Sequence, residues 1–370
     1  MGPYSLQTCN QGTNQGRGVG GGCPLPVKNH KRLPLVRSSH SSALLHMEEV
    51  ELCFPELLNS SCRRTKPSPS AAVLVPLTLS FICLTAVTLN LLVIISVSQF
   101  RQLHTPTNLL ILSLAVSDFS AGLLVVFQIL FLDGCWYLGD LMCVFYYVLD
   151  FAVTCSSVGN MVLISVDRYI AICHPLHYAS KVTLSRARLA VSLCWICSLF
   201  YDFVLLNENL KHPGKFNLCL GECVIGASSA EAVTDLLVSL VIPITAITVL
   251  SARVFAAAVS QIRAVRPQAA GQPQSGGVTV RKSELRAART LGVVVVVFLT
   301  CLLPYYCAVL EGPAGFVSLS SVVFFTYLFY LNSCLNPLIY ALFYPWFRKS
   351  VKIIVTLQVL KPGSRDIKMM

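Results

Sequence analysis

Residues 141–166 read LMCVFYYVLDFAVTCSSVGNMVLISV and lead directly into Asp167-Arg168-Tyr169. Only one side chain in that run, Asp150, carries a formal charge. An apolar run of about twenty residues or more is what a helix needs to cross the hydrocarbon core of a bilayer. The stretch therefore predicts a membrane-spanning helix with a single acid inside it.

Six more apolar runs accompany this one, so the chain has seven candidate spans. They cover residues 71–98, 107–131, 141–166, 188–206, 233–257, 288–311 and 316–343. Helices are implied, because the strands of a membrane barrel would alternate apolar and polar residues. The composition agrees, since 55% of the residues are hydrophobic, 12% are charged and the mean hydropathy is +0.68. We predict an all-α membrane protein, a bundle of seven transmembrane helices.

Lysine and arginine are spread unevenly around the runs. The segment between the fifth and sixth runs carries Arg263, Arg266, Arg281, Lys282, Arg286 and Arg289 against Glu284, and the tail adds Arg348, Lys349 and Lys352. Basic segments stay in the cytoplasm, which puts the N-terminus outside. Arg63, Arg64 and Lys66 argue mildly the other way. The formal charge of +11 reflects this topology and attraction to anionic lipid, and it does not indicate nucleic-acid binding.

Four regions follow from this pattern. Residues 1–46 lack an apolar run and any periodicity, so we expect a disordered extension, and Met47 is a candidate physiological start. Residues 47–70 are an extracellular segment, and residues 71–343 are the seven-helix domain. Residues 344–370 are a short cytoplasmic eighth helix and tail, in which Trp346, Phe347 and nearby bases would lie on the membrane surface.

Lone carboxylates inside three of the runs are of particular interest, namely Asp118, Asp150 and Asp235. An acid in hydrocarbon costs several kcal/mol, so it is expected to serve a function and to have a cation as partner. The pattern suggests a membrane receptor for a positively charged ligand. The alternative for Asp150 is a structural hydrogen bond between helices, with Tyr330 available as donor.

The third run also places two charges on one helix face. Asp150 and Arg168 are eighteen residues apart, or five turns, which separates them by about 27 Å along that face. Ser157 and Cys143 lie on the same stripe, two turns to either side of Asp150. One charge would therefore face an outer vestibule and the other the cytoplasm.

Sixteen cysteines are present, and about half of them lie inside apolar runs, where cysteine acts as a small hydrophobic residue. The others in predicted extracellular segments are Cys53, Cys62, Cys135, Cys143, Cys219 and Cys223. Disulfides are expected there. A zinc site at Cys219 and Cys223 is the alternative, although no histidine is close by. Asn59-Ser60-Ser61 is a glycosylation sequon in the same region.

Seven motifs along the chain resemble those of the rhodopsin-like (class A) G-protein-coupled receptors. They are Asn90, Asp118, Asp167-Arg168-Tyr169, Trp195, Pro243, Pro304 and Asn336-Pro337-Leu338-Ile339-Tyr340, which cover residues 70–355 in order. Within that superfamily, the chain resembles the trace amine-associated receptors, including the diamine-sensing type of fish. The stretches that carry this likeness are Asn332 to Ile353, Cys135-Trp136-Tyr137, and Leu103-His104-Thr105-Pro106-Thr107-Asn108.

The resemblance implies an amine site. Asp150 matches the aspartate that pairs with the ligand's ammonium group, and Asp235 would add a second anion where many amine receptors carry hydroxyls. Two separated acids suit a diamine such as putrescine or cadaverine, because a monoamine would leave one desolvated charge unpaired. The aromatic walls offering cation–π contacts would be Tyr305, Tyr306 and Tyr330. The alternatives are a monoamine receptor for a serotonin-, tyramine- or dopamine-like ligand, and an Asp235 that faces water or lipid.

The resemblance also implies two disulfides. Cys143 would bond Cys223, and Cys62 in the N-terminal segment would bond Cys219 in the same loop. Each would hold the loop as a lid over the pocket. Cys53 would then be a free thiol.

For signalling, the resemblance implies a lock at Arg168, paired with Asp167 and with Glu284, whose opening admits a heterotrimeric G protein, expected to be stimulatory. The alternative is a surface ion pair worth less than about 1 kcal/mol. The residues that would serve activation and G-protein coupling are Asp167, Arg168, Tyr169, Glu284, Asn336, Pro337 and Tyr340. A sodium ion or water cluster, in preference to simple packing, would be held by Asp118, Ser157, Asn332 and Asn336.

Two positions depart from the superfamily pattern. Leu302 stands where a tryptophan usually lies beneath the ligand, and Ser251 replaces a tyrosine in the fifth span. Both changes bear on efficacy more than on ligand binding. No cysteine follows Cys334, so the usual palmitoyl anchor after the eighth helix is missing.

Other classes of protein fit less well. We find no internal repeat of the kind that transporters show and no filter-like loop of a channel. No phosphate loop or catalytic motif is present, so we expect no enzyme, no catalytic residues and no cofactor apart from the sodium ion. We expect a multi-pass receptor of the plasma membrane that acts as a trace-amine or olfactory chemosensor. An amine transporter is the remote alternative.

Overall fold

The computed structural model describes residues 51–57, 59–64, 68–131, 134–265, 290, 292–304, 306–307 and 319–369. Several expectations therefore fall outside the described residues. They concern the extension 1–46, Glu284, Tyr305 and most of the basic segment before the sixth run.

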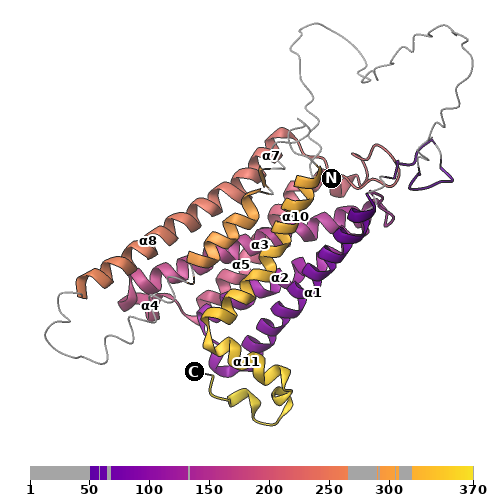
Figure 1. Ribbon diagram of the computed structural model, residues 1–370. Coiled ribbons are helices and arrows are strands. Elements are labelled where there is room, and N and C mark those ends of the chain that lie inside the picture. The colour runs from indigo at the N-terminus through magenta and orange to yellow at the C-terminus, as the bar shows by residue number, and fades with distance from the viewer. Residues whose placement is uncertain are drawn as a thin grey trace, which may run out of the picture.

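Long helices lie side by side along most of the molecule (Figure 1). The long elements are α1 (Pro69–Gln99), α2 (Pro106–Leu130), α3 (Asp140–Cys173), α5 (Leu184–Leu205), α8 (Ile242–Val265), the segment Gly292–Pro304, and α10 (Leu319–Phe343). The short ones are η1 (Arg101–Leu103), α4 (Pro175–Lys181), α6 (Asn207–Lys211), α7 (Ser229–Asp235), the π-helical turn η2 (Leu236–Val241), α11 (Pro345–Val355), η5 (Gln358–Leu360) and η6 (Ser364–Asp366).

Hydroxyl residues mark where the helices begin. The Thr105 hydroxyl accepts a hydrogen bond from the Asn108 amide at 3.2 Å, and Pro106 occupies the first turn of α2. Before α7, the Ser228 hydroxyl accepts from the Glu231 amide while the Glu231 carboxylate accepts from the Ser228 amide, which is a complete capping box. Each such cap contributes about 1 kcal/mol, so the chain encodes its helix starts locally.

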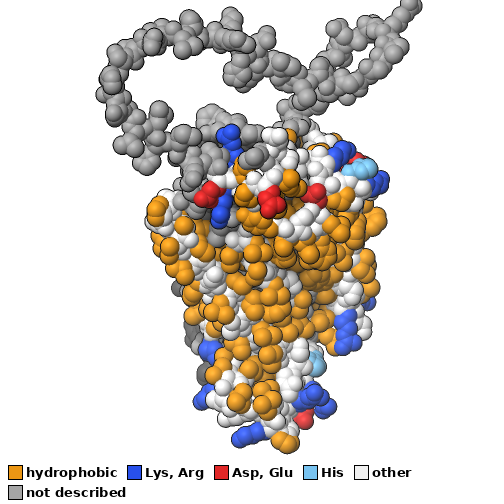
Figure 2. Space-filling view, turned by 90° about the vertical axis from the view of Figure 1, so that its right-hand side faces the viewer, with side chains coloured by type: hydrophobic (Ala, Val, Ile, Leu, Met, Phe, Trp, Pro, Cys, Tyr) orange, Lys and Arg blue, Asp and Glu red, His pale blue; other side chains and the backbone are white. Residues whose placement is uncertain are grey.

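The face of the bundle shown in Figure 2 is apolar over its middle and carries charged side chains toward its two ends. Phe81 is 69% exposed and Phe200 70%, both on helices long and apolar enough to cross a membrane. Among the described residues, five helices meet that criterion, and Gly292–Pro304 is a shorter apolar helix. Hydrocarbon is the environment in which such side chains are stable, so these faces contact lipid.

The eighth helix predicted after the last span is present as α11. Trp346, Phe347 and Ile353 are buried, whereas Arg348 and Lys349 are exposed on the other side. The tail beyond α11 folds back toward η1, where the amide of Met369 donates to the side chain of Gln102 at 2.9 Å.

Three disulfides gather at the other end of the bundle, which we call the disulfide end. The bonds are Cys53–Cys135, Cys62–Cys219 and Cys143–Cys223. The last two join the cysteines that the resemblance pairs. Each bond closes a loop of about 80 residues or more, which restricts the unfolded chain strongly.

The expectation of a free thiol at Cys53 is wrong. The segment between Cys53 and Cys62 turns back on itself, and the Cys53 backbone amide donates to the Cys62 carbonyl at 2.9 Å. Gly221 lets the segment that contains Cys53 approach closely. Its φ is +98°, and a Cβ at residue 221 would lie 2.9 Å from the Cys53 Cβ. The turn thus carries Cys53 to Cys135 while Cys62 reaches Cys219.

Candidate functional site

Asp150 lies on α3 and lines a small cavity inside the bundle. The other lining residues include Thr154, Ser157, Leu302, Phe329 and Asn332. The Tyr330 hydroxyl approaches one Asp150 oxygen at 3.5 Å, and no ion pair among the described residues involves Asp150. A carboxylate inside the bundle with one weak hydrogen bond is a strong site for a cation.

Among the expected aromatic walls that the structure describes, Tyr330 contacts Asp150. It is 4% exposed and its ring packs edge-on against Phe329. Tyr306 is half-buried and packs against the core between α3, α8 and the segment Gly292–Pro304. The structure therefore supports an aromatic role at Asp150 for Tyr330.

An aromatic cluster that was not predicted from the sequence lies on the disulfide side of Asp150. Tyr146 and Tyr147 come one turn before Asp150. The ring of Tyr146 packs with Trp136, Phe127 and Tyr147. The Tyr147 hydroxyl approaches the Cys223 carbonyl at 3.5 Å, which ties the loop to α3. The signal was present in the sequence, since i−4 and i−3 lie on the face of i in a helix.

Asp235 is buried, so it faces neither water nor lipid. Its Oδ1 accepts from the Tyr201 hydroxyl at 3.2 Å and from the Ser239 hydroxyl at 2.7 Å. Tyr201 belongs to α5, and Asp235 is not among the residues that line the cavity at Asp150. The second acid is therefore turned toward α5.

A fourth acid of the apolar runs, Asp202, lies beside Asp235. It is on α5, is 0% exposed, and interacts electrostatically with Asp235. Asp202 was not among the residues identified from the sequence, although it falls inside the predicted span 188–206 and meets the same criterion as the other three acids.

Asp118 is 1% exposed and holds α2 and α10 together. The Asn336 amide donates to Asp118 Oδ2 at 2.8 Å, and Ser157 and Ser333 also interact with this carboxylate. Among the described residues, Asp118 Oδ1 and Asn332 Oδ1 have no hydrogen-bond partner. Carboxylate, hydroxyl and amide oxygens are the donor set of a hard cation, so the residues present fit a sodium ion.

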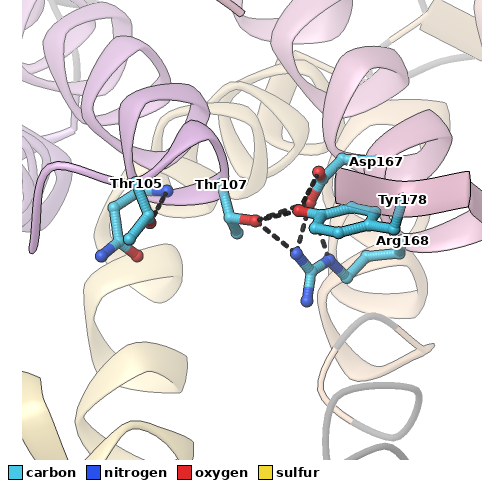
Figure 3. Close-up of polar contacts among 6 residues, drawn as sticks. Thr105, Thr107, Asp167, Arg168 and Tyr178 are labelled. Carbon is cyan, nitrogen blue, oxygen red and sulfur yellow. Dashed lines mark hydrogen bonds and ion pairs between the residues drawn. The ribbon is translucent and has the colours of Figure 1, made fainter. Parts of the chain in front are cut away.

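Arg168 sits in a network at the opposite end of the bundle, which we call the α11 end (Figure 3). Its guanidinium binds Asp167 and also donates to the Thr107 hydroxyl, which in turn donates to Asp167 Oδ2 at 2.9 Å. The Tyr178 hydroxyl donates to Asp167 Oδ1 at 2.9 Å. Burial raises the pKa of Tyr178, so its phenol stays protonated as a donor.

This network is not a surface ion pair. The side chains of Arg168 and Asp167 are 16% and 2% exposed. Thr107 and Tyr178 complete the network. They were not identified from the sequence, because they lie on α2 and α4 whereas Asp167 and Arg168 lie on α3. Tyr169 instead packs edge-on against His174.

A second small cavity at the α11 end brings other predicted residues together. It is lined by Arg168, Thr107 and Tyr340, with Tyr344 and Thr290 among its other walls. Pro337 lies inside α10, between Asn336 at the Asp118 cluster and Tyr340 at this cavity. α10 contributes to the walls of both cavities, through Asn332 at the first and Tyr340 at the second.

Comparisons with known proteins agree with this arrangement. Residues 89–340 match the 7 transmembrane receptor (rhodopsin family). The chain belongs to that family of multi-pass membrane receptors, which implies a small-molecule ligand and a G-protein partner and is a class of receptors rather than enzymes.

The relatives narrow the class. The chain is 36% identical to trace amine-associated receptor 13c of Danio rerio, over 86% of this chain and 95% of that receptor. It is 37% identical to trace amine-associated receptor 7b of Rattus norvegicus, over 88% and 93%. The same identity holds for trace amine-associated receptor 6 of Pan troglodytes, over 88% and 97%. This is a receptor of the trace amine-associated type.

Proposed function

We propose that this receptor binds a protonated amine through Asp150 and passes the signal to a G protein. The supporting observation is the Asp150 carboxylate at a cavity inside the bundle, contacted by Tyr330 at 3.5 Å and by no cation among the described residues. An ammonium group at that carboxylate gains far more Coulomb energy than it would in water, so a small ligand needs few other contacts.

The finer proposal is a diamine ligand. Asp235 is a second buried acid in the membrane part of the bundle, and a diamine such as cadaverine would neutralise both Asp150 and Asp235. The relatives are named for trace amines, which is consistent with small amines as ligands.

A monoamine receptor is the second candidate. Asp235 already accepts hydrogen bonds from Tyr201 and Ser239, and it is turned toward α5. A monoamine bound at Asp150 would then leave Asp235 as it is in this structure.

The surroundings of the site complete the proposal. The disulfide end faces the outside with Asn59, which is exposed, carrying a glycan, and the α11 end faces the cytoplasm and a stimulatory G protein. A sodium ion at Asp118, Ser157, Asn332 and Asn336 would stabilise the state without ligand. We propose the plasma membrane of chemosensory, including olfactory, cells as the location.

The test is a panel of monoamines and diamines in a cyclic-AMP reporter line. Asp150→Ala should abolish the response to every amine, while Glu208→Gln, at an exposed acid paired with Lys215, should leave it unchanged. Asp235→Ala should lose diamines and spare or improve monoamines. A full response from Asp150→Ala would refute the proposal, and uptake of radiolabelled diamine without nucleotide exchange would favour a transporter.

A further inference from the structure

A series of hydrogen bonds leads from α2 to the Asp150 carboxylate. The Gln128 side-chain amide donates to the Tyr146 hydroxyl. The Tyr146 and Tyr330 hydroxyls are hydrogen-bonded to each other, and the Tyr330 hydroxyl approaches Asp150 Oδ1 at 3.5 Å. These four residues join α2, α3 and α10, and we call them the Gln128–Asp150 relay.

The chemistry of the four groups fixes the direction of the relay. An ionised carboxylate can only accept hydrogen bonds, so Tyr330 uses its one hydroxyl hydrogen on Asp150. Tyr330 must then accept from Tyr146, and Tyr146 must itself accept from a further donor. The Gln128 amide is that donor. Every hydrogen in the relay is therefore directed toward Asp150, and Gln128 is the group at its start.

The middle of the relay has little contact with water. Tyr146 is 2% exposed and Tyr330 is 4% exposed. The ring of Tyr146 packs with Phe127, Trp136 and Tyr147. A buried hydroxyl that loses its partner has no water to replace it, and hydrogen bonds in series strengthen one another. Loss of the first donor is therefore expected to affect the last acceptor.

Helix geometry explains how the relay reaches the proposed amine site. Tyr146 and Asp150 are four residues apart on α3, so their side chains lie on the same face. Gln128 is half-buried in the last turn of α2, which ends at Leu130. A side-chain amide in an apolar span is costly unless it is hydrogen-bonded. The bond to Tyr146 provides that partner for Gln128.

We propose that Gln128 is a positioning residue of the amine site, which acts through Tyr146 and Tyr330 to orient the Asp150 carboxylate. The inference rests on the proposed amine receptor and deepens it, because Gln128 is not among the residues that line the cavity at Asp150. An ammonium group needs a carboxylate oxygen in line with its N–H donors. A carboxylate that is already oriented loses less freedom when the amine binds, so the relay raises amine affinity.

The test is a double-mutant cycle at matched surface expression in the cyclic-AMP reporter line, with a panel of primary amines that includes cadaverine and tyramine. Gln128→Met keeps the length of the side chain and removes its amide, and Tyr146→Phe keeps the ring and removes its hydroxyl. We expect each variant to raise the half-maximal amine concentration about three- to tenfold, the scale of one hydrogen bond. The double variant should be less than about twofold worse than the poorer single variant, because both changes interrupt one relay.

A matched control and a parallel variant make the result specific. Ser120 is on α2 as well, and its hydroxyl donates to the Val116 carbonyl of the same helix, so Ser120→Ala should respond as the wild type does. Asp150→Ala is measured in parallel, and its full response to amines would overturn the proposed function itself. Loss of the response in Asp150→Ala beside wild-type potency in Gln128→Met would overturn only the role of Gln128.

The double variant separates positioning from a merely structural role. If the losses of Gln128→Met and Tyr146→Phe add up in full, Gln128 acts independently of Tyr146 and the inference is wrong. Gln128→Leu is the second variant if Gln128→Met fails to reach the cell surface. In receptors that already carry Tyr146→Phe, Gln128→Leu should change amine potency by less than about twofold, and a larger change would overturn the inference.

Discussion

Replacing Thr107 by valine tests the network at Arg168. The Thr107 hydroxyl accepts from the Arg168 guanidinium and donates to Asp167 at 2.9 Å, so one small side chain joins both members of the ion pair. Valine has nearly the same shape and lacks both bonds. We expect Thr107→Val to release Arg168 and to raise signalling in the absence of ligand.

The size of the effect follows from the contacts. Each lost hydrogen bond involves a charged group and is worth about 1.5–3 kcal/mol. Thr107 is half-buried, so water replaces part of the loss, and about 1.5 kcal/mol is the appropriate scale for the pair. This corresponds to about a tenfold shift toward the state in which Arg168 is free, for example from about 1% to about 10% of receptors.

The assay is basal cyclic AMP at matched surface expression, with Thr107→Ser as control. Serine keeps the hydroxyl that both bonds need, so its basal signal should stay near that of the wild type. Equal basal signals for Thr107→Val and the wild type, at equal surface density, would refute the reasoning that this network holds the resting state.

Three further predictions concern other parts of the structure. Cys53→Ser should lower the melting temperature in detergent, because a disulfide that closes an 82-residue separation is worth about 2–4 kcal/mol, and an unaltered melting curve would contradict that role. Asp118→Asn should abolish the effect of sodium on agonist potency, so persistence of the effect would remove Asp118 from the ion site. Gly221→Ala should cost more than about 1 kcal/mol, because its Cβ would lie 2.9 Å from that of Cys53 at a φ of +98°; Gly292→Ala, where nothing lies within 4 Å, is the thermal-stability control.

The membrane class and most helices could be predicted from sequence because those signals are local. An apolar run reports its own environment, and caps such as Thr105 and Ser228 act within three residues. The single face shared by Asp150 and Arg168 is likewise a property of one helix. The motifs added the family, and with it the partners of Cys62 and Cys143.

Contacts between helices could not be predicted in this way. Thr107 and Asp167 are 60 residues apart on different helices, so no periodicity relates them. Cys53 was predicted to have no partner for the same reason, since only the folded N-terminal segment brings it to Cys135.

Asp235 shows most clearly what the sequence determined and what only the tertiary structure determined. The sequence alone determined that an acid lies in the fifth apolar run. Only the tertiary structure decided that its carboxylate faces Tyr201 and Asp202 on α5, because the rotation of a helix about its axis is set by packing against its neighbours. The π-helical turn η2 after Asp235 adds to that rotation, and it is visible only in the folded backbone.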